Sequence, residues 1–345
     1  MKALVFLLWL GAAVPGFATG ATRFVVDDDA YAAQVSQAGE KLLRAHKLFS
    51  LETLRAEVHT SGAALSLTPL WHEKLDAPDL CERLRESTFA VGSLYRCPDC
   101  GGWHFSGSSG FVINENGIIC TCCHVLIEED AQIKESYLVA ADSAGHVFPV
   151  KSVVAADTDA DCCLLKIEAN GLKPLPLRTG ARAGESVYCL SHPGGYYFMF
   201  TQGIISRLNR RTNADHAEHG HEAAAGGRAV VMLNITAEFA PGSSGAPVVD
   251  TSGNVVGQVA SIADAGEPAE EGETQAAAPS VPVRFCTATE ELLRLMNPNL
   301  AKDSRGTAPL RPAKKNKVKK LSQRPVCPLA KPPEVQQFND TPGVF

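Results

Sequence analysis

Short apolar runs recur along the middle of the chain, from about residue 89 to residue 290, with turn-forming residues between them. The runs are rich in valine and isoleucine, and Asn116-Gly117 between the first two is a signal for a tight hairpin. About a dozen runs follow one another with no helical pattern between them, which predicts an all-β barrel or sandwich. Examples are GFVI, GIICT, SYLVAA, CCLLKI, SVYCLS, FTQGIISRL and VVGQVASI.

Helical patterns flank this region. Residues 21–88 predict a helical N-terminal extension, because the segment from Asp27 to Ser50 has acidic residues at its start and basic residues near its end, as the helix dipole favours. After the last strand pattern, Thr287 and Glu290 have the spacing of a capping box, which predicts a C-terminal helix. Residues 299–345 are rich in proline and lysine and predict a disordered tail.

Residues 1–20 have the pattern of a signal peptide: a lysine, an apolar run and then small residues. The apolar run is too short to span a bilayer, and no later stretch is long and apolar enough to do so. We therefore expect an exported protein, secreted or periplasmic, with no stable membrane insertion after signal removal. A retained N-terminal anchor is the alternative. The formal net charge of −6 does not favour a nucleic-acid partner.

Three segments carry the residues of a nucleophilic triad: GIICTCCHVL has His124, DTDADCCLLKI has Asp161, and PGSSGAPVVD has Ser244. A serine hydroxyl is a poor nucleophile without a neighbouring base, and the base needs an acid that fixes its tautomer. Small residues on both sides of Ser244 allow a sharp turn. Such a turn brings the N–H groups of Gly242 and Ser244 together as an oxyanion hole. A plain Gly/Ser turn is the alternative for this segment taken alone.

Taken together, these segments resemble the trypsin-like serine peptidases, specifically the HtrA/Deg-type branch, across residues 89–298. GSSGFVINENGIICTCCHVL is similar to that branch's glycine-rich strand and T-x-x-H-V histidine segment. DADCCLLKI is similar to its aspartate strand, and APGSSGAP to its serine loop. HPGGYYFMFTQGIISRL and GNVVGQVASI match supporting strands in the expected order.

The resemblance implies a double six-stranded β-barrel of the trypsin-like type, with the active site in the cleft between the barrels. It implies a serine endopeptidase that acts on protein or peptide substrates through an acyl-enzyme and needs no cofactor. His124 would be the base, Asp161 would orient it, and Ser244 would attack the scissile carbonyl. A catalytically inactive fold that acts as a peptide- or protein-binding module is the alternative.

The chain departs from the pattern of the branch at several positions. Ala246 stands where the branch has a second glycine, and Ser243 stands where it has asparagine. The stretch after Met296 is too short for a PDZ domain, so we expect a member of this branch without one.

The resemblance also places a primary specificity pocket. The backbone at Ala260, Ser261 and Ile262 would line this pocket and pair with an extended substrate. Glu238 at its base would favour basic side chains, whereas Phe239 filling it would favour small ones.

Eleven cysteines are present, and in an oxidising compartment most would form disulfides, with at least one left over. Two cysteine doublets, Cys122-Cys123 and Cys162-Cys163, have three interpretations: small buried side chains, a cross-strand disulfide, or a metal site. Burial is favoured and the disulfide is the main alternative, whereas a metal is disfavoured because a zinc ion on His124 would remove the base.

CPDCGGWH resembles a zinc knuckle, in which Cys97 and Cys100 would be joined by His104 and Cys81. Export favours a disulfide among Cys97, Cys100 and Cys81 instead, and free thiols are the third alternative. We therefore assign no metal here from the sequence. Three histidines of one polar loop are expected to be solvent-exposed rather than metal-bound: His216, His219 and His221.

Overall fold

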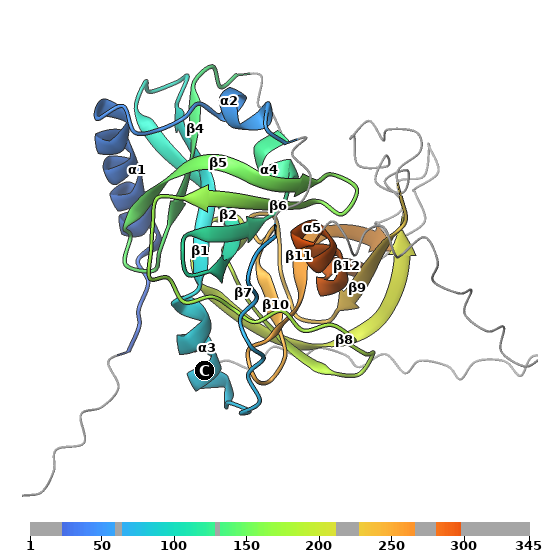
Figure 1. Cartoon of the computed structure of the whole chain (residues 1–345). Helices are drawn as coiled ribbons and strands as arrows, with labels where there is room; N and C mark the ends of the chain where they lie inside the picture. The colour runs from blue at the N-terminus through green and yellow to red at the C-terminus, as the bar shows by residue number, and fades with distance from the viewer. Residues whose placement is uncertain (1–22, 59–63, 128–131, 212–227, 266–280, 298–345) are drawn as a thin grey trace, which may run out of the picture. The chain divides into compact units, whose positions relative to one another are not determined.

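The computed structural model describes residues 23–58, 64–127, 132–211, 228–265 and 281–297. The expected signal peptide, the expected tail and the three loop histidines lie outside these residues. The described chain folds as two closed six-stranded antiparallel barrels with a few helices, which confirms the predicted all-β class (Figure 1).

The first barrel has the strand order β1-β2-β3-β6-β5-β4, and the second has β10-β11-β12-β9-β8-β7. In both, neighbouring strands pair antiparallel. The strands of the first barrel are β1 (Thr88–Arg96), β2 (Trp103–Asn114), β3 (Ile118–Thr121), β4 (Ser136–Ala141), β5 (Val147–Asp157) and β6 (Cys162–Ile167). Those of the second are β7 (Ser186–Ser191), β8 (Met199–Arg211), β9 (Val230–Ile235), β10 (Pro247–Val249), β11 (Val255–Ala265) and β12 (Val281–Ala288).

Several strands are buried on both faces, which explains why their sequences read as continuous apolar runs. In β6, Leu165 packs inside the first barrel, whereas Leu164 packs in a cluster that contains residues of both barrels. A third cluster, which includes Val187 and Val259, fills the second barrel. The apolar cluster shared by both barrels holds the two halves of the candidate site together.

Six helical segments accompany the barrels in the described part of the chain. In the longest of them, the Asp27 side chain accepts a hydrogen bond from Ala30 N at 2.9 Å and so caps the start of the helix. None of the described helices is long and apolar enough to cross a membrane. The segments are α1 (Asp28–Arg44), α2 (Leu51–Arg55), α3 (Ala77–Arg85), α4 (His124–Ile127), the 3-10 turn η1 (Pro193–Gly195) and α5 (Thr289–Met296).

The C-terminal helix α5 is present, but the predicted capping box is wrong. Its N-cap is Ala288, which supplies no side-chain bond. Thr287 instead lies in β12 and donates its hydroxyl to Ala160 O at 2.8 Å, while Glu290 accepts from Gly180 N at 2.8 Å. Both side chains therefore form hydrogen bonds with distant segments of the fold instead of capping the start of α5.

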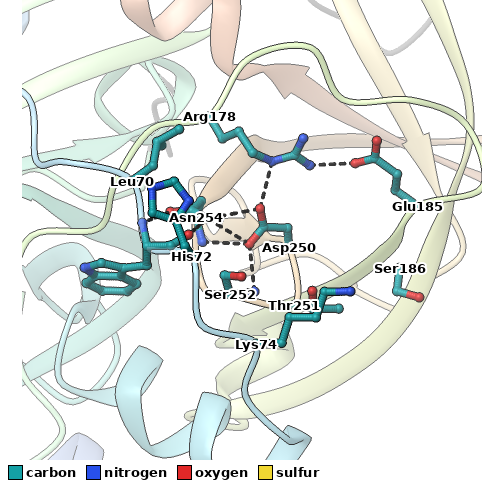
Figure 2. A pocket seen from close by; sticks show the side chains of 11 residues that line it. Leu70, His72, Lys74, Arg178, Glu185, Ser186, Asp250, Thr251, Ser252 and Asn254 are labelled. Atoms are coloured by element: carbon teal, nitrogen blue, oxygen red, sulfur yellow. Dashed lines mark hydrogen bonds and ion pairs between the residues drawn. The ribbon is translucent and has the colours of Figure 1, made fainter.

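The N-terminal extension is only partly helical. Between α2 and α3, residues 64–76 have no helix and form a strap along the turn between β10 and β11 (Figure 2). Trp71 N donates to Asn254 Oδ1 at 2.8 Å, and Asn254 Nδ2 donates back to Trp71 O at 2.9 Å. Leu75 N donates to Thr251 O at 3.0 Å. The strap is thus fixed to the second barrel.

The helix α1 contacts both barrels. The hydroxyl of Tyr31 donates to Asp142 O, just after β4, at 2.9 Å. The Asp28 carboxylate accepts from Tyr197 N, between β7 and β8, at 2.8 Å, and the ring centroids of Tyr31 and Tyr197 lie 4.4 Å apart. The extension therefore packs as part of the described fold.

Candidate active site

His124 and Asp161 lie side by side on the first barrel. His124 begins α4, shortly after β3, and Asp161 occupies the turn before β6 with a φ of 52°. One carboxylate oxygen of Asp161 lies 2.7 Å from His124 Nδ1, and the other accepts from His124 N at 3.0 Å. The carboxylate thus holds both the ring and the backbone of the histidine. With Nδ1–H donating to it, the imidazole has its lone pair on Nε2.

The same contacts set the charge of Asp161. Burial alone would raise the pKa of this carboxyl, but the charge of His124 and its ring and backbone hydrogen bonds lower it. The net effect is a pKa below the ordinary value for aspartate. Asp161 is therefore ionised at neutral pH and can stabilise a positive charge on the ring.

The serine loop reaches the histidine segment through a shared carbonyl. Gly245 N donates to Val259 O at 2.9 Å, and the thiol of Cys122 donates to the same oxygen at 3.2 Å. Gly245, directly after Ser244, and Cys122, two residues before His124, thus bond the same carbonyl oxygen of β11. Ser244 O also accepts from Ser109 N on β2 at 2.9 Å. The structure brings all three triad segments to the junction of the barrels.

The N–H groups of Gly242 and Ser244 satisfy one requirement of an oxyanion hole. In the described part of the chain, neither N–H donates a hydrogen bond, although Ser243 N between them donates to Ala240 O at 2.9 Å. Gly242 has a φ of 94°, and a Cβ there would lie 2.6 Å from His192 O. Only glycine suits this position, because it needs a left-handed backbone and a close approach of a carbonyl.

The loop that follows β7 supports this turn, a role that was not expected from the sequence. His192 is fully buried; its backbone N–H donates to Ser109 Oγ at 3.1 Å, and Ser109 Oγ donates to Gly242 O at 3.0 Å. Gly194 N donates to Pro241 O at 2.7 Å. Burial lowers the pKa of His192 to about 3, so the ring is neutral, and its Nδ1 accepts from Phe198 N at 3.0 Å.

Gln258 is a second residue whose role was not expected from the sequence. It lies on β11 of the second barrel and is fully buried. Its Oε1 accepts from the Cys120 thiol at 2.8 Å, and its Nε2 donates to Cys122 Sγ and to Asp161 O, each at 3.2 Å. One side chain from the second barrel thus links the histidine strand and the aspartate turn of the first. The sequence feature that could have indicated this role is a glutamine within the apolar run VVGQVASI.

The expected pocket residues divide by burial. Glu238 is exposed, whereas Phe239 is buried in the interior of the second barrel, with only 6% of its surface exposed. Ala260 is buried at a bulge of β11, where the pairing with β12 shifts between Val259 and Ser261. Ser261 and Ile262 are half-buried. Of the two side chains expected at the base of the pocket, only Phe239 lies inside the barrel.

The four doublet cysteines are buried as free thiols, which is the favoured interpretation from the sequence. The alternative cross-strand disulfide is not formed, although Cys123 and Cys163 share the interior of the first barrel. Cys162 points to the opposite face of β6, into the cluster shared by the barrels. Cys123 donates instead to Cys162 O at 3.0 Å, and its contact with Cys163 together with burial raises its pKa.

The disulfide expected among Cys81, Cys97 and Cys100 is also not formed, because all ten described cysteines are free in the structure. Cys81 lies on α3 and packs against the apolar cluster shared by the barrels. Cys97 is held differently: the backbone N–H groups of Cys100 and Asp99 hydrogen-bond its sulfur and lower its pKa.

Two groups among the described residues have side chains placed to share a metal ion. One is Cys97, Cys100 and His104; the other is Cys122, His124 and Asp161. In the second group, the ligand atoms already bond within the candidate triad or to Gln258 and Val259.

A pocket of about 440 Å³ lies beside the strap, and none of the triad residues lines it (Figure 2). Its arginine is neutralised, because Arg178 pairs with Glu185 at 2.6 Å and with Asp250 at 2.7 Å. The pocket contributes no group to the candidate active site.

Comparison with known proteins finds relatives of this chain. Residues 108–257 match the family model described as a trypsin-like peptidase domain. Protease Do-like 1 of Arabidopsis thaliana chloroplasts is 32% identical over 154 residues, which cover 43% of this chain and 31% of that protein. Mitochondrial serine protease HTRA2 of Drosophila persimilis is 28% identical over 228 residues, covering 61% of this chain and 49% of that protein.

The chain thus spans about a third to a half of the length of these curated relatives. Among solved structures, an HtrA-type protease AlgW with a decapeptide aligns with a TM-score of 0.47 and 19% identity, covering 64% of this chain and 66% of that one. This similarity is too low to bear on function. The family match, the double barrel and the ordered segments show that the chain carries a trypsin-like peptidase domain, with relatives among the HtrA and Do-like serine proteases.

Proposed function

We propose that the protein is a serine endopeptidase with the triad His124, Asp161 and Ser244. Ser244 Oγ attacks the scissile carbonyl while His124 Nε2 takes its proton, and Asp161 stabilises the imidazolium that forms. The N–H groups of Gly242 and Ser244 stabilise the oxyanion of the tetrahedral intermediate. His124 then gives the proton to the leaving amine, and water hydrolyses the acyl-enzyme by the same route.

One observation carries this proposal: the two-point contact between His124 and Asp161, at 2.7 and 3.0 Å, beside the strand that meets the serine loop. A carboxylate that holds only the ring would be compatible with a simple ion pair. Here it also holds the backbone N–H, and its depressed pKa keeps it charged. Such an arrangement prepares a neutral imidazole to act as a base.

The test is labelling of the full chain with a fluorophosphonate probe, which reacts with an activated serine. We expect labelling of the wild type and none of Ser244→Ala or His124→Ala. Ser243→Ala is the matched control, because Ser243 is adjacent but fully buried and bonds Ser191 Oγ at 3.1 Å. A wild type that stays unlabelled while a trypsin-like control reacts would exclude the enzyme and favour the alternative of a peptide-binding module.

For the primary specificity pocket, we propose a preference for small uncharged side chains before the cleaved bond. The support is the burial of Phe239 and the exposure of Glu238. Cleavage of a peptide library should therefore favour alanine or valine over lysine or arginine at this position. Phe239→Ala should shift the preference to larger side chains, whereas Glu238→Gln should leave it unchanged. A wild-type preference for basic residues would contradict this assignment.

We also propose export, since the N-terminal pattern is that of a signal peptide. Cleavage after Ala18, Gly20 or Ala21 would keep Phe24, Asp28 and Tyr31 in the mature chain, and these residues contact the loop after β7. The mass and the N-terminal sequence of the protein recovered from its host compartment would test this. Recovery of the intact N-terminus would favour a retained anchor.

A further inference from the structure

The hairpin between β1 and β2 ends in a turn with two cysteines and is followed by a histidine. Cys97 and Cys100 lie in the turn, and His104 is on β2. The two sulfurs and one ring nitrogen of His104 all lie within 4.8 Å of one another. Cys100 Sγ and His104 Nε2 are 3.1 Å apart. Three side chains that can bind a metal thus converge at a surface of the first barrel.

The backbone of the turn is held by its own hydrogen bonds. Cys97 N donates to Gly102 O at 2.9 Å, and Gly101 N, in a residue with a φ of 66°, donates to Cys97 O at 3.0 Å. Gly102 N donates to Cys100 Sγ at 3.4 Å. These hydrogen bonds within the turn fix the backbone that carries both sulfurs.

The spacing of these atoms is close to what zinc requires. Zn–S bonds of about 2.3 Å and Zn–N bonds of about 2.0 Å place tetrahedral ligand atoms roughly 3.5–3.8 Å apart. The three ligand atoms lie within 4.8 Å of one another, and Cys100 Sγ and His104 Nε2 are 3.1 Å apart, so these distances bracket that spacing. A disulfide needs the two sulfurs at about 2.0 Å and leaves His104 without a role.

We propose that Cys97, Cys100 and His104 bind one zinc(II) ion, with solvent in the fourth coordination position. His104 coordinates through Nε2 as neutral imidazole. Each thiol loses its proton on coordination, so the binding of one zinc ion releases two protons and involves no redox change. Two thiolates and an imidazole are a donor set that suits zinc over magnesium or calcium. The site stands apart from the proposed catalytic residues and does not depend on their activity.

The test uses the full chain, reduced, stripped of metal with a chelator and titrated with cobalt(II), which reports on coordination geometry. We expect one cobalt(II) per chain, with thiolate-to-cobalt charge-transfer absorption, tetrahedral d–d bands, and displacement by equimolar zinc(II). Cys97→Ser with Cys100→Ser should abolish these signals. His104→Ala should weaken zinc affinity at least about tenfold, because loss of even a residue that only bonds a metal ligand costs about 10–100-fold.

Cys81→Ser is the matched control, because Cys81 lies on α3 outside the cluster, and this variant should bind as the wild type does. Circular dichroism must show that the variants are folded. Retained binding in the double serine variant, with loss in Cys122→Ser, would move the ion to the other cluster and overturn the proposal. Failure of the reduced wild type to bind cobalt(II) or zinc(II) would also overturn it, whether or not mass spectrometry then finds a Cys97–Cys100 disulfide.

Discussion

The side-chain amide of Gln258, on the second barrel, donates a hydrogen bond to the main-chain carbonyl of Asp161 on the first, at 3.2 Å. The same amide bonds the thiols of Cys120 and Cys122 in the segment that leads to His124. Gln258 therefore positions the segments of His124 and Asp161, the proposed base and acid, relative to the barrel that carries Ser244. Its hydrogen bonds reach none of the three side chains of the proposed triad, so its role is positional.

Gln258→Leu should lower both stability and kcat. Leucine has a similar size but leaves the carbonyl of Asp161 buried without this partner, which costs about 1–3 kcal/mol of unfolding free energy. Displacement of Asp161 should reduce kcat with little change in KM, as measured on a peptide substrate. Gln202→Leu is the control, since the Gln202 amide bonds Tyr188 OH at 3.3 Å elsewhere in the second barrel. A variant with reduced stability but wild-type kcat would show that Gln258 is only structural.

Asp161→Asn should lower kcat by about four orders of magnitude, the effect of the equivalent change in a serine protease triad. Asparagine tolerates the φ of 52° at this position, so the fold should survive. The amide cannot hold the imidazole in the required tautomer or stabilise its positive charge. Asp142→Asn is the matched control, because Asp142 pairs with the exposed His146 at 2.9 Å, outside the triad. Equal rates for the two variants would remove Asp161 from the mechanism.

Gly245→Ala should abolish fluorophosphonate labelling through the placement of the serine loop. Gly245 has a φ of 86°, and a Cβ there would lie 2.2 Å from Ser109 O and 2.5 Å from Thr121 Oγ1. Gly180→Ala is the control, since Gly180 has a φ of 73° but a Cβ there would meet nothing within 4 Å. Both alanines cost about 1–2 kcal/mol for the left-handed backbone. Only Gly245→Ala should also push the serine loop away from β2, so comparable labelling of both variants would contradict this role.

His192 should make stability depend on pH. Its pKa is about 3 in the folded protein and near 6.5 when unfolded, so the unfolded chain binds the extra proton as the pH falls. The stability it contributes is complete above about pH 6.5 and is lost toward acid, by about 2 kcal/mol between pH 7 and pH 5. His192→Asn keeps an acceptor for Phe198 N and removes the titration. Urea unfolding at the two pH values should show that difference in the wild type but not in the variant.

The strands could be predicted from the sequence because most of them carry β-branched, apolar runs that are typical of buried sheets. The segments of the proposed triad could be picked out too, since each has a local context: a histidine after a strand, an aspartate before one, a serine between glycines. Short-range patterns of this kind need no knowledge of the rest of the fold. The contact between His124 and Asp161 follows directly from the pairing of β3 with β6.

Contacts between distant segments were not predictable in this way. His192 is packed against Tyr197 and Phe198, and its neutral state depends on that burial. The Thr287 hydroxyl bonds Ala160 O rather than the start of α5. The cysteines are free rather than joined in the expected disulfides for a similar reason. That expectation rested on export to an oxidising compartment, and the sequence does not show which carbonyls and N–H groups surround each sulfur.

The strap has a consequence for the order in which the chain can assemble. Trp71 bonds Asn254, which lies 183 residues later, and Asp28 bonds Tyr197, 169 residues later. During synthesis from the N-terminus, the extension is made first but cannot dock until the second barrel exists. Gln258, which ties the histidine and aspartate turns together, is made later still. A chain that ends before Gln258 therefore has all three residues of the proposed triad but lacks the amide that links their segments.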